Sequence, residues 1–315
     1  METRHRVWLT LVTALAPATW GSTYLVTAKW LPPDRPLLAG ALRALPAGLL
    51  LLAATRVLPR RSWWWRALVL GTLNMGAFLA LLYVAAYRLP GGVAATVISV
   101  QPLIVALLAV PLLGERLPRR RLLAGTTGVL GVALLVLNSR AELDPVGVAA
   151  GLGAAGCMSV GVVLTQRWKR PDGVPLLAFT GWQLTAGGLA LAPLALIFEG
   201  LPATLSAGNV GGFAYLSLIG AAATFPLWIR GISQLSAPVV SFLGLLSPVV
   251  ASLLGVAVLA QTFTGWQTLG FAIVLASVFA GQLPSRLPTD RPAAAAAPLG
   301  APRRPQSSGT SRSSA

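Results

Sequence analysis

Apolar residues along the chain fall into ten long runs between about Val7 and Leu283, and nearly every charged residue lies between two runs. A bilayer core about 30 Å thick is crossed by roughly 20 helical residues. Hydrocarbon offers the backbone no hydrogen-bond partner, so each run must form a helix that closes its own bonds. The pattern therefore predicts an all-α membrane protein with ten transmembrane helices. The expected spans are 7–28, 37–55, 67–87, 91–113, 121–139, 145–166, 174–198, 209–230, 235–259 and 264–283.

The composition agrees with a chain that lies mostly in lipid. Hydrophobic residues make up 55% of the 315 residues and charged residues 10%, and the mean hydropathy is +0.74. In soluble domains, roughly a quarter of all residues are charged. A soluble enzyme or binding domain is therefore disfavoured.

The net charge of +16 would suit a nucleic-acid partner, but the placement of the charges indicates membrane orientation instead. With the N-terminus inside, 19 of the 24 Lys and Arg residues fall on the cytoplasmic side, and one more lies within a helix. The other four are Lys29, Arg35, Arg88 and Arg140. Loops rich in Lys and Arg stay in the cytoplasm. We expect a multi-pass protein of the cytoplasmic membrane with both termini inside and no nucleic-acid partner.

The two ends of the sequence differ in character. The first 20 residues resemble a secretory signal, but the apolar run continues past Pro17 to Ala28, which favours a retained helix. Residues 284–315 are mostly Pro, Ala, Ser and Arg, and such a segment cannot bury enough apolar surface to fold. They are expected to form a disordered basic cytoplasmic tail.

The two halves of the chain resemble each other. A shift of 146 residues places Pro102 on Pro248, and near the start of each half Thr27–Trp30 matches Thr165–Trp168. Each half holds five helices, and because five is odd the second copy must enter the membrane from the other side. We expect repeats at 1–139 and 140–283. Inverted repeats are typical of alternating-access transporters, whose site lies near the bilayer centre.

Several segments resemble the EamA-type part of the drug/metabolite transporter superfamily. They are Trp20–Tyr24, Arg43, the run from Tyr83 to Gly131, and Gly181–Leu184. The resemblance covers all ten runs and implies a transporter of small metabolites, with a cavity lined by helices 1–4 and 6–9. One departure is that Gln261 stands at the second-half counterpart of Glu115, so a symmetric acidic pair is missing. Glu115 itself is expected to pair with Arg116 or Arg119 rather than to act as a gate.

Trp20 and Tyr24 belong to a polar and aromatic stripe on the first helix. Thr13, Pro17 and Thr27 complete it at steps of three and four, so the five residues share one face. Two interpretations remain open for the aromatic pair, namely cavity lining and anchoring at the membrane interface. Helices 5 and 10 are the most uniformly apolar, and we expect them to be scaffold or a homodimer interface.

Arg43 lies early in the second helix, roughly 9 Å below the expected outer edge at 1.5 Å per residue. An arginine at the membrane centre costs about 2.5–3.5 kcal/mol on insertion scales, and less near an interface. No carboxylate of helices 1–4 lies at its depth. Arg43 therefore faces a wet cavity or helix carbonyls, where it can attract an anionic substrate group, or it extends to the outer headgroups.

Two polar–proline pairs, Gln101–Pro102 and Ser247–Pro248, stand near the middle of their helices. Proline removes one N–H and displaces the carbonyl four residues earlier. These sites are expected either to contact substrate and bend during transport or to form purely structural kinks. Asn74 and Gln183 are further deep polar candidates.

The sequence lacks the parts that an enzyme would need. His5 is the single histidine and Cys157 the single cysteine, so neither a metal site nor a Ser–His pair is expected, and no cofactor is implied. Coupling to protons usually needs an intramembrane Asp, Glu or His, and only the edge carboxylates Asp144 and Glu199 stand near. We expect a transporter in the lipid bilayer that moves a small metabolite such as an amino acid, with export favoured. The alternative is a non-transporting receptor or assembly scaffold.

Overall fold

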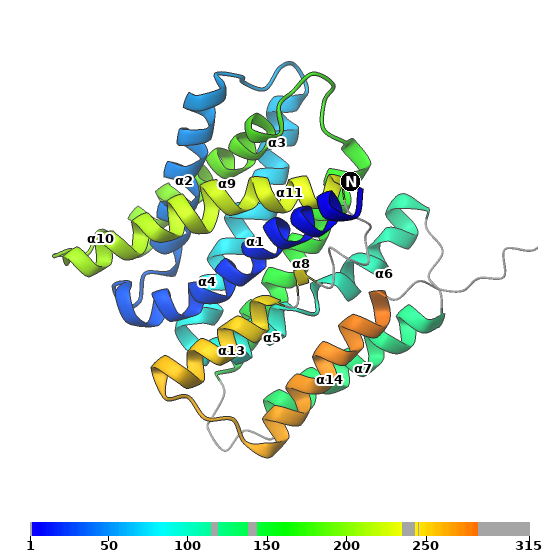
Figure 1. The fold of residues 1–315 in the computed structure, drawn as a ribbon. Coiled ribbons are helices and arrows are strands. Elements are labelled where there is room, and N and C mark those ends of the chain that lie inside the picture. Colours follow the sequence, from blue (N-terminus) through cyan, green and yellow to red (C-terminus); the bar gives the residue numbers. More distant parts are fainter. Residues whose placement is uncertain (1, 115–118, 138–143, 235–242, 245, 283–315) are drawn as a thin grey trace, which may run out of the picture. The chain divides into compact units, whose positions relative to one another are not determined.

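The computed structural model describes residues 2–114, 119–137, 144–234, 243–244 and 246–282. Helices account for nearly all of these residues, and no strand occurs among them (Figure 1). In the first half the helices are α1 (Glu2–Trp30), α2 (Pro36–Thr55), α3 (Trp63–Gly71), η1 (Thr72–Ala77), α4 (Phe78–Arg88), α5 (Gly91–Ile98), α6 (Gln101–Leu113) and α7 (Arg119–Leu137). In the second half they are α8 (Pro145–Trp168), α9 (Leu176–Phe198), α10 (Ala207–Ala214), η2 (Tyr215–Ala223), α11 (Thr224–Gln234), α13 (Leu246–Leu259) and α14 (Gly265–Gln282).

Six helical stretches within the described ranges are long and apolar enough to cross a bilayer. They match the second, third, fourth, sixth, seventh and eighth predicted spans, at Pro36–Thr55, Trp63–Arg88, Gly91–Leu113, Pro145–Trp168, Leu176–Phe198 and Ala207–Gly231. The all-helical prediction is confirmed for the described residues. The ten-helix count stays a prediction, because the start of the ninth expected span lies outside the described residues. Glu115 and the expected tail also lie outside them, so the predictions for both stay predictions.

Three of the six spans depart from a regular α-helix. The Trp63–Arg88 span contains the π-helical segment η1, and the span that begins at Ala207 contains a second one, η2. The 146-residue shift places residues 72–77 on 218–223, inside η2. The Gly91–Leu113 span breaks at Ser99–Val100, just before Gln101–Pro102. Irregularities of this kind often mark functional sites in helices.

Helices α2 and α9, which the predicted repeat matches with each other, pack against each other and run antiparallel. The Glu199 carboxylate, just after the end of α9, accepts the N–H groups of Leu37 and Leu38 at 2.7 and 2.8 Å. Near the other end, Trp182 Nε1 donates to the Val57 carbonyl at 2.7 Å. A carboxylate at a helix start satisfies free N–H groups and complements the helix dipole. Glu199 therefore fixes the start of α2 beside the end of α9.

Helices α7 and α14, which the predicted repeat also matches with each other, form a second antiparallel pair. A Cβ added at Gly128 would lie 2.7 Å from Ser277, and one at Gly131 would lie 3.0 Å from Val274. The contact position moves three residues forward on α7 and three backward on α14. Small residues allow this approach in a membrane. The two helices that the sequence singled out as most apolar thus contact each other within one chain.

Glycine at position 48 is expected to be essential for the α2–α9 contact, because an added Cβ would lie 2.4 Å from the Thr185 backbone nitrogen. Overpacking of this kind costs about 1–3 kcal/mol. Gly48→Ala should therefore lower the melting temperature of the purified protein, followed by tryptophan fluorescence. Gly156→Ala is the matched control, because its added Cβ would meet no neighbouring helix within 4 Å. Equal melting temperatures for the two variants would rule out the close contact.

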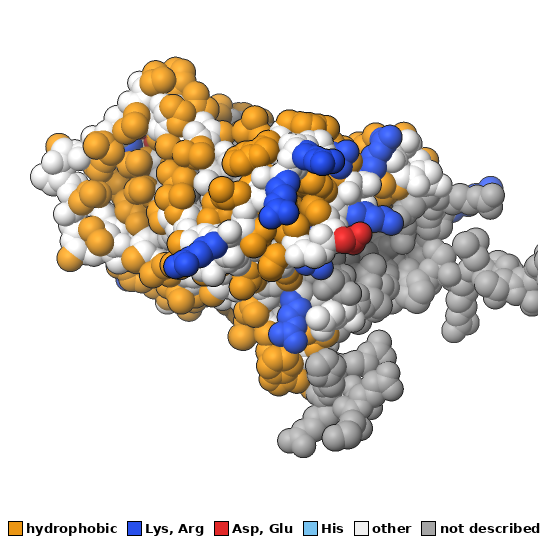
Figure 2. Space-filling view, turned by 90° about the horizontal axis from the view of Figure 1, so that it is seen from above, with side chains coloured by type: hydrophobic (Ala, Val, Ile, Leu, Met, Phe, Trp, Pro, Cys, Tyr) orange, Lys and Arg blue, Asp and Glu red, His pale blue; other side chains and the backbone are white. Residues whose placement is uncertain are grey.

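The helix ends fall into two groups, and the ends within each group contact one another. In the first group, which we call the arginine-rich end, the 56–62 loop and the 169–175 loop lie close together, because Trp65 stacks edge-on against Trp168 at 5.1 Å (Figure 1). Lys and Arg side chains spread over this face, with hydrophobic side chains between them (Figure 2). In the second group, Tyr87 Oη donates to the Pro32 carbonyl at 2.8 Å and Arg88 pairs with Asp144 at 2.5 Å. We call this group the opposite end.

Candidate functional site

The Arg43 guanidinium lies inside the helix bundle, where only 3% of the residue is exposed. Its Nη2 donates to the Gly220 carbonyl at 2.9 Å, and Nη1 donates to Thr23 Oγ1 at 3.2 Å. Tyr83 Oη lies at 3.5 Å from Nη1. This Arg43 cluster joins α2 with α1, α4 and η2. Of the two sequence-based interpretations, the contacts agree with the helix-carbonyl environment and not with an arginine that extends to headgroups.

The Gly220 carbonyl accepts three donors at once. Besides Arg43, it receives Trp20 Nε1 at 3.2 Å and Thr224 Oγ1 at 2.9 Å, and Trp20 Nε1 also lies 2.9 Å from Thr224 Oγ1. Gly220 belongs to η2, where the π-helical turn displaces the regular i→i+4 bonding pattern. The exposed partial charge of a carbonyl stabilises the guanidinium in place of a carboxylate.

One donor of the cluster has no acceptor. Arg43 Nε is buried and lacks a hydrogen-bond partner among the described residues. A buried unpaired N–H costs about 1–3 kcal/mol, and more when the group is charged. A bound anion that accepts this N–H would recover that cost. The geometry therefore favours an anionic or carbonyl group as ligand.

Trp20 and Tyr24 both lie beside the Arg43 cluster on α1. The Trp20 ring is half-buried and packs against Phe225 at 5.1 Å and Trp228 at 5.3 Å between ring centroids. Tyr24 is 5% exposed, and its Cβ faces Gly91 of α5. Both side chains point into the bundle. The arrangement gives the Arg43 cluster an aromatic wall.

Asn74 and Gln183 form a second polar cluster, which we call the amide cluster. Asn74 Nδ2 donates to Gln183 Oε1 at 2.8 Å and to Thr165 Oγ1 at 3.3 Å. Asn74 Oδ1 is buried without a partner among the described residues and lies against Gly161. This cluster joins η1, α8 and α9. It leaves an unpaired acceptor, whereas the Arg43 cluster leaves an unpaired donor.

The proline pairs form separate contacts. The Gln101 carbonyl accepts Ser159 Oγ at 3.1 Å, and the Ser247 carbonyl faces Gly21, where an added Cβ would lie 2.7 Å away. Pro248 is buried, whereas the residues Gln101, Pro102 and Ser247 are partly exposed. The structure thus groups the predicted residues into three places rather than one. Trp20, Tyr24 and Arg43 come together, Asn74 joins Gln183, and each proline pair meets a helix of the other half.

Sequence reasoning missed several partners, namely Thr23, Tyr83, Thr165, Gly220 and Thr224. The contact of Thr224 with Trp20 joins the eighth span to the polar stripe on the first helix. Gly220 gives no signal in the sequence, because its carbonyl is the functional group. The positions of η1 and η2 were likewise not foreseen.

Asp144 and Glu199, the edge carboxylates considered for coupling, both have structural partners. Asp144 caps α8 through the N–H groups of Val146 and Gly147, and it pairs with Arg88. The Arg88 hydrogen bond and these N–H groups hold the pKa of the Asp144 carboxyl below its usual value of 3.8. Glu199 caps α2. Within the described residues, no group of three or more His, Cys, Asp and Glu side chains is placed to hold a metal ion.

We expect Asp144→Asn to leave the pH profile of transport unchanged between about pH 6 and 8. A carboxyl with a lowered pKa stays ionised through this range, and the interaction it makes is lost only as pH falls through that lowered pKa. Initial transport rates of the variant and the parent, measured across the range, check this. A profile that flattens in the variant would assign Asp144 to proton coupling.

Known proteins resemble this chain in sequence along most of its length. The model of the EamA-like transporter family matches twice, at residues 7–137 and 145–280. Protein PecM of Dickeya dadantii is 43% identical over 263 residues, which cover 84% of this chain and 88% of PecM. A chloroplastic WAT1-related protein of Arabidopsis thaliana is 30% identical over 281 residues, covering 84% of this chain and 67% of that protein.

A further relative and a solved structure match a similar share of this chain. The uncharacterized inner membrane transporter YedA of Escherichia coli K12 is 27% identical over 82% of this chain and 87% of its own length. One solved structure, described as a crystal structure of protein, aligns with a TM-score of 0.63 at 21% identity, covering 87% of this chain and 96% of that one. That likeness supports the fold alone. Two matches to one family model, each covering nearly half of the sequence, show that the chain belongs to the EamA-like transporter family, whose members are membrane transporters of the drug/metabolite transporter superfamily.

Proposed function

We propose that the chain exports a small carboxylate-bearing metabolite, such as an amino acid, across the cytoplasmic membrane by alternating access between two inverted five-helix halves. The observation that supports this proposal most strongly is that the Arg43 cluster and the amide cluster join corresponding helices of the two predicted halves. Each joins the second helix of one half to the π-helical third helix of the other. Each also includes a hydroxyl from the first helix of a half.

The residues support this equivalence. The 146-residue shift places Asn74 of the amide cluster on Gly220 of the Arg43 cluster. The match of Leu37–Ala39 with Leu176–Ala178 places Arg43 on Trp182, next to Gln183. Two clusters related in this way can open in turn, as alternating access requires.

The direction of the helices supports opposed halves. α2 and α9 run antiparallel, and Arg43 and Gln183 each lie seven residues from the start of their helix, or about 10 Å along it. The two clusters are therefore displaced toward opposite ends of the bundle. An inverted repeat produces this displacement, whereas a parallel repeat would place both clusters at one end.

Orientation follows from the charges. The arginine-rich end carries Arg56, Arg60 and Arg61 on one loop and Lys169 and Arg170 on another. Such loops face the cytoplasm. The proposal places the amide cluster toward the cytoplasm and the Arg43 cluster toward the outside, with both termini in the cytoplasm.

Exchange across reconstituted vesicles tests the proposed substrate class. Vesicles are loaded with an unlabelled amino-acid mixture, and uptake of a labelled amino acid is compared with uptake of its decarboxylated amine. The pair differs in the group that Arg43 Nε is proposed to bind. Saturable exchange of the acid and not of the amine is expected. Equal exchange of both, or exchange of neither, would overturn the assignment, and lower cellular export on deletion would support the direction.

A further inference from the structure

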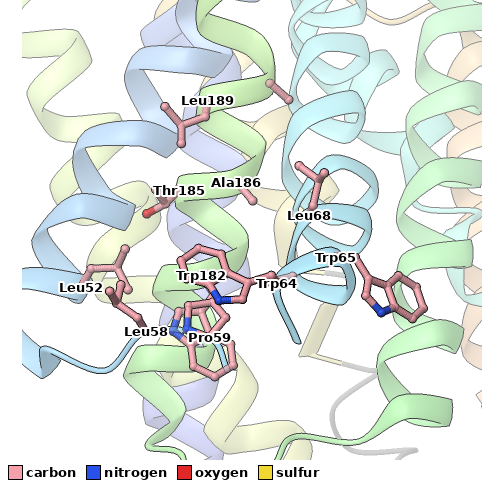
Figure 3. A pocket seen from close by; sticks show the side chains of 12 residues that line it. Leu52, Leu58, Pro59, Trp64, Trp65, Leu68, Trp182, Thr185, Ala186 and Leu189 are labelled. Carbon is pink, nitrogen blue, oxygen red and sulfur yellow. The ribbon is translucent and has the colours of Figure 1, made fainter. Parts of the chain in front are cut away.

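A cavity of about 510 Å³ opens between α2, α3 and α9 beside the arginine-rich end (Figure 3), and none of its lining residues belongs to either polar cluster. Its walls are apolar except for Thr185, whose hydroxyl is buried without a hydrogen-bond partner in the described chain. Trp64, Leu68 and Leu189 line it and are each more than half exposed, so the groove faces outward. The remaining lining residues are Leu52, Leu58, Pro59, Trp65, Ala67, Trp182, Ala186 and Ala190.

Three arginines stand next to lining residues of this groove in the chain. Arg60 and Arg61 directly follow the lining residue Pro59, and both are exposed. Arg66 lies 5.5 Å from the ring of Trp65, which lines the groove, and also within 5.6 Å of Trp63 and Trp168. Its Nε is buried and has no acceptor among the described residues. Cation–π contacts of this type hold the guanidinium in place.

These cations form no ion pair with the described part of the chain. No Asp or Glu occurs in the sequence between Asp34 and Glu115. The ion pair found within the described ranges joins Arg88 to Asp144 at the opposite end. An apolar groove whose lining residues neighbour arginines without a carboxylate partner suits a ligand with an acyl chain and an anionic head. Basic residues next to a membrane helix attract anionic lipid, at about 1 kcal/mol for each Lys or Arg.

We propose that this groove holds one anionic phospholipid, with an acyl chain along Leu68 and Leu189 and its phosphate at Arg60, Arg61 and Arg66. The lipid fills space between α2, α3 and α9, and it neutralises the cations at the helix ends. The site is separate from the Arg43 and amide clusters. The inference does not depend on the proposed substrate or on the direction of transport.

Lipid retention in native mass spectrometry tests the site, using the full-length protein purified from nanodiscs that contain phosphatidylglycerol and phosphatidylcholine in equal parts. The parent should retain phosphatidylglycerol. Arg60→Gln with Arg61→Gln should lower its retention at least threefold, and so should Ala190→Phe, which fills the groove. Leu68→Trp replaces the Ala190 variant if that variant does not fold, because Leu68 is exposed.

The matched control removes two cations from the same end but not from the groove, through Arg167→Gln with Lys169→Gln. Its retention should equal that of the parent. An equal loss in the control, or no loss in either groove variant, would overturn the site. Displacement of the lipid by soluble glycerophosphoglycerol would show that the arginines bind phosphate without the groove, and would overturn it as well. Arg43→Gln should leave retention unchanged, which keeps this test independent of transport.

Discussion

Arg43→Gln is expected to lower saturable transport by about 10- to 100-fold in reconstituted vesicles. Arg43 supplies the charge of its cluster and the unpaired Nε proposed to meet the substrate. Hydrogen bonds to charged groups contribute about 1.5–3 kcal/mol, and each 1.4 kcal/mol corresponds to a factor of ten. Exchange rates at several substrate concentrations measure the loss.

Arg43→Lys is the informative companion variant. It keeps the charge but loses the planar array of donors, so it should recover only part of the transport. A melting temperature close to that of the parent would show that either variant still folds. Unchanged transport in a folded Arg43→Gln protein would remove Arg43 from the mechanism.

Asn74→Ala is expected to open the arginine-rich end, in mirror image to the effect of Arg43→Gln on the opposite end. Loss of the Asn74 amide leaves Gln183 Oε1 buried without its donor, which costs about 1–3 kcal/mol in the state where the amide cluster is closed. A cost of this size shifts a nearly balanced pair of states by about 5- to 150-fold. The open state should therefore dominate.

Spin labels at Ser62 and Asp172 report on the arginine-rich end, and labels at Asp34 and Ser206 report on the opposite end. Asn74→Ala should lengthen the first distance and leave the second unchanged, whereas Arg43→Gln should do the reverse. Thr55→Ala serves as a control, because Thr55 bonds only to the Leu51 carbonyl of its own helix and joins no cluster of the described residues. If both substitutions lengthened the same distance, the two clusters would not be counterparts.

The helices were predictable because their signal is strong. Some twenty consecutive apolar residues leave the backbone no alternative in lipid, and the described spans follow the runs read from the sequence. Arg43 was predictable for a related reason, since a charge within an apolar run needs a specific partner. Asn74 and Gln183 were recognised one by one.

The partners of these residues were not predictable. The acceptor of Arg43 is the Gly220 carbonyl, and every residue type carries such a carbonyl. Whether it is free depends on the π-helical turn, which is a backbone adjustment without a sequence signature at this position. The pairing of Asn74 with Gln183 depends on how η1 meets α9, and that contact is set by glycines such as Gly71 and Gly187. Sequence periodicity identifies the face of a helix but not the neighbour it meets.

The central claim is that the two halves are inverted, and labelling of single cysteines tests it most directly. In a Cys157→Ser background, Ser62→Cys introduces a thiol on the loop of the arginine-rich end, and Ser206→Cys introduces one at the start of α10. Both positions are exposed. A membrane-impermeant maleimide applied to intact cells should label the Ser206→Cys protein at once and the Ser62→Cys protein only after permeabilisation. Labelling of both variants from the same side would contradict the inverted arrangement.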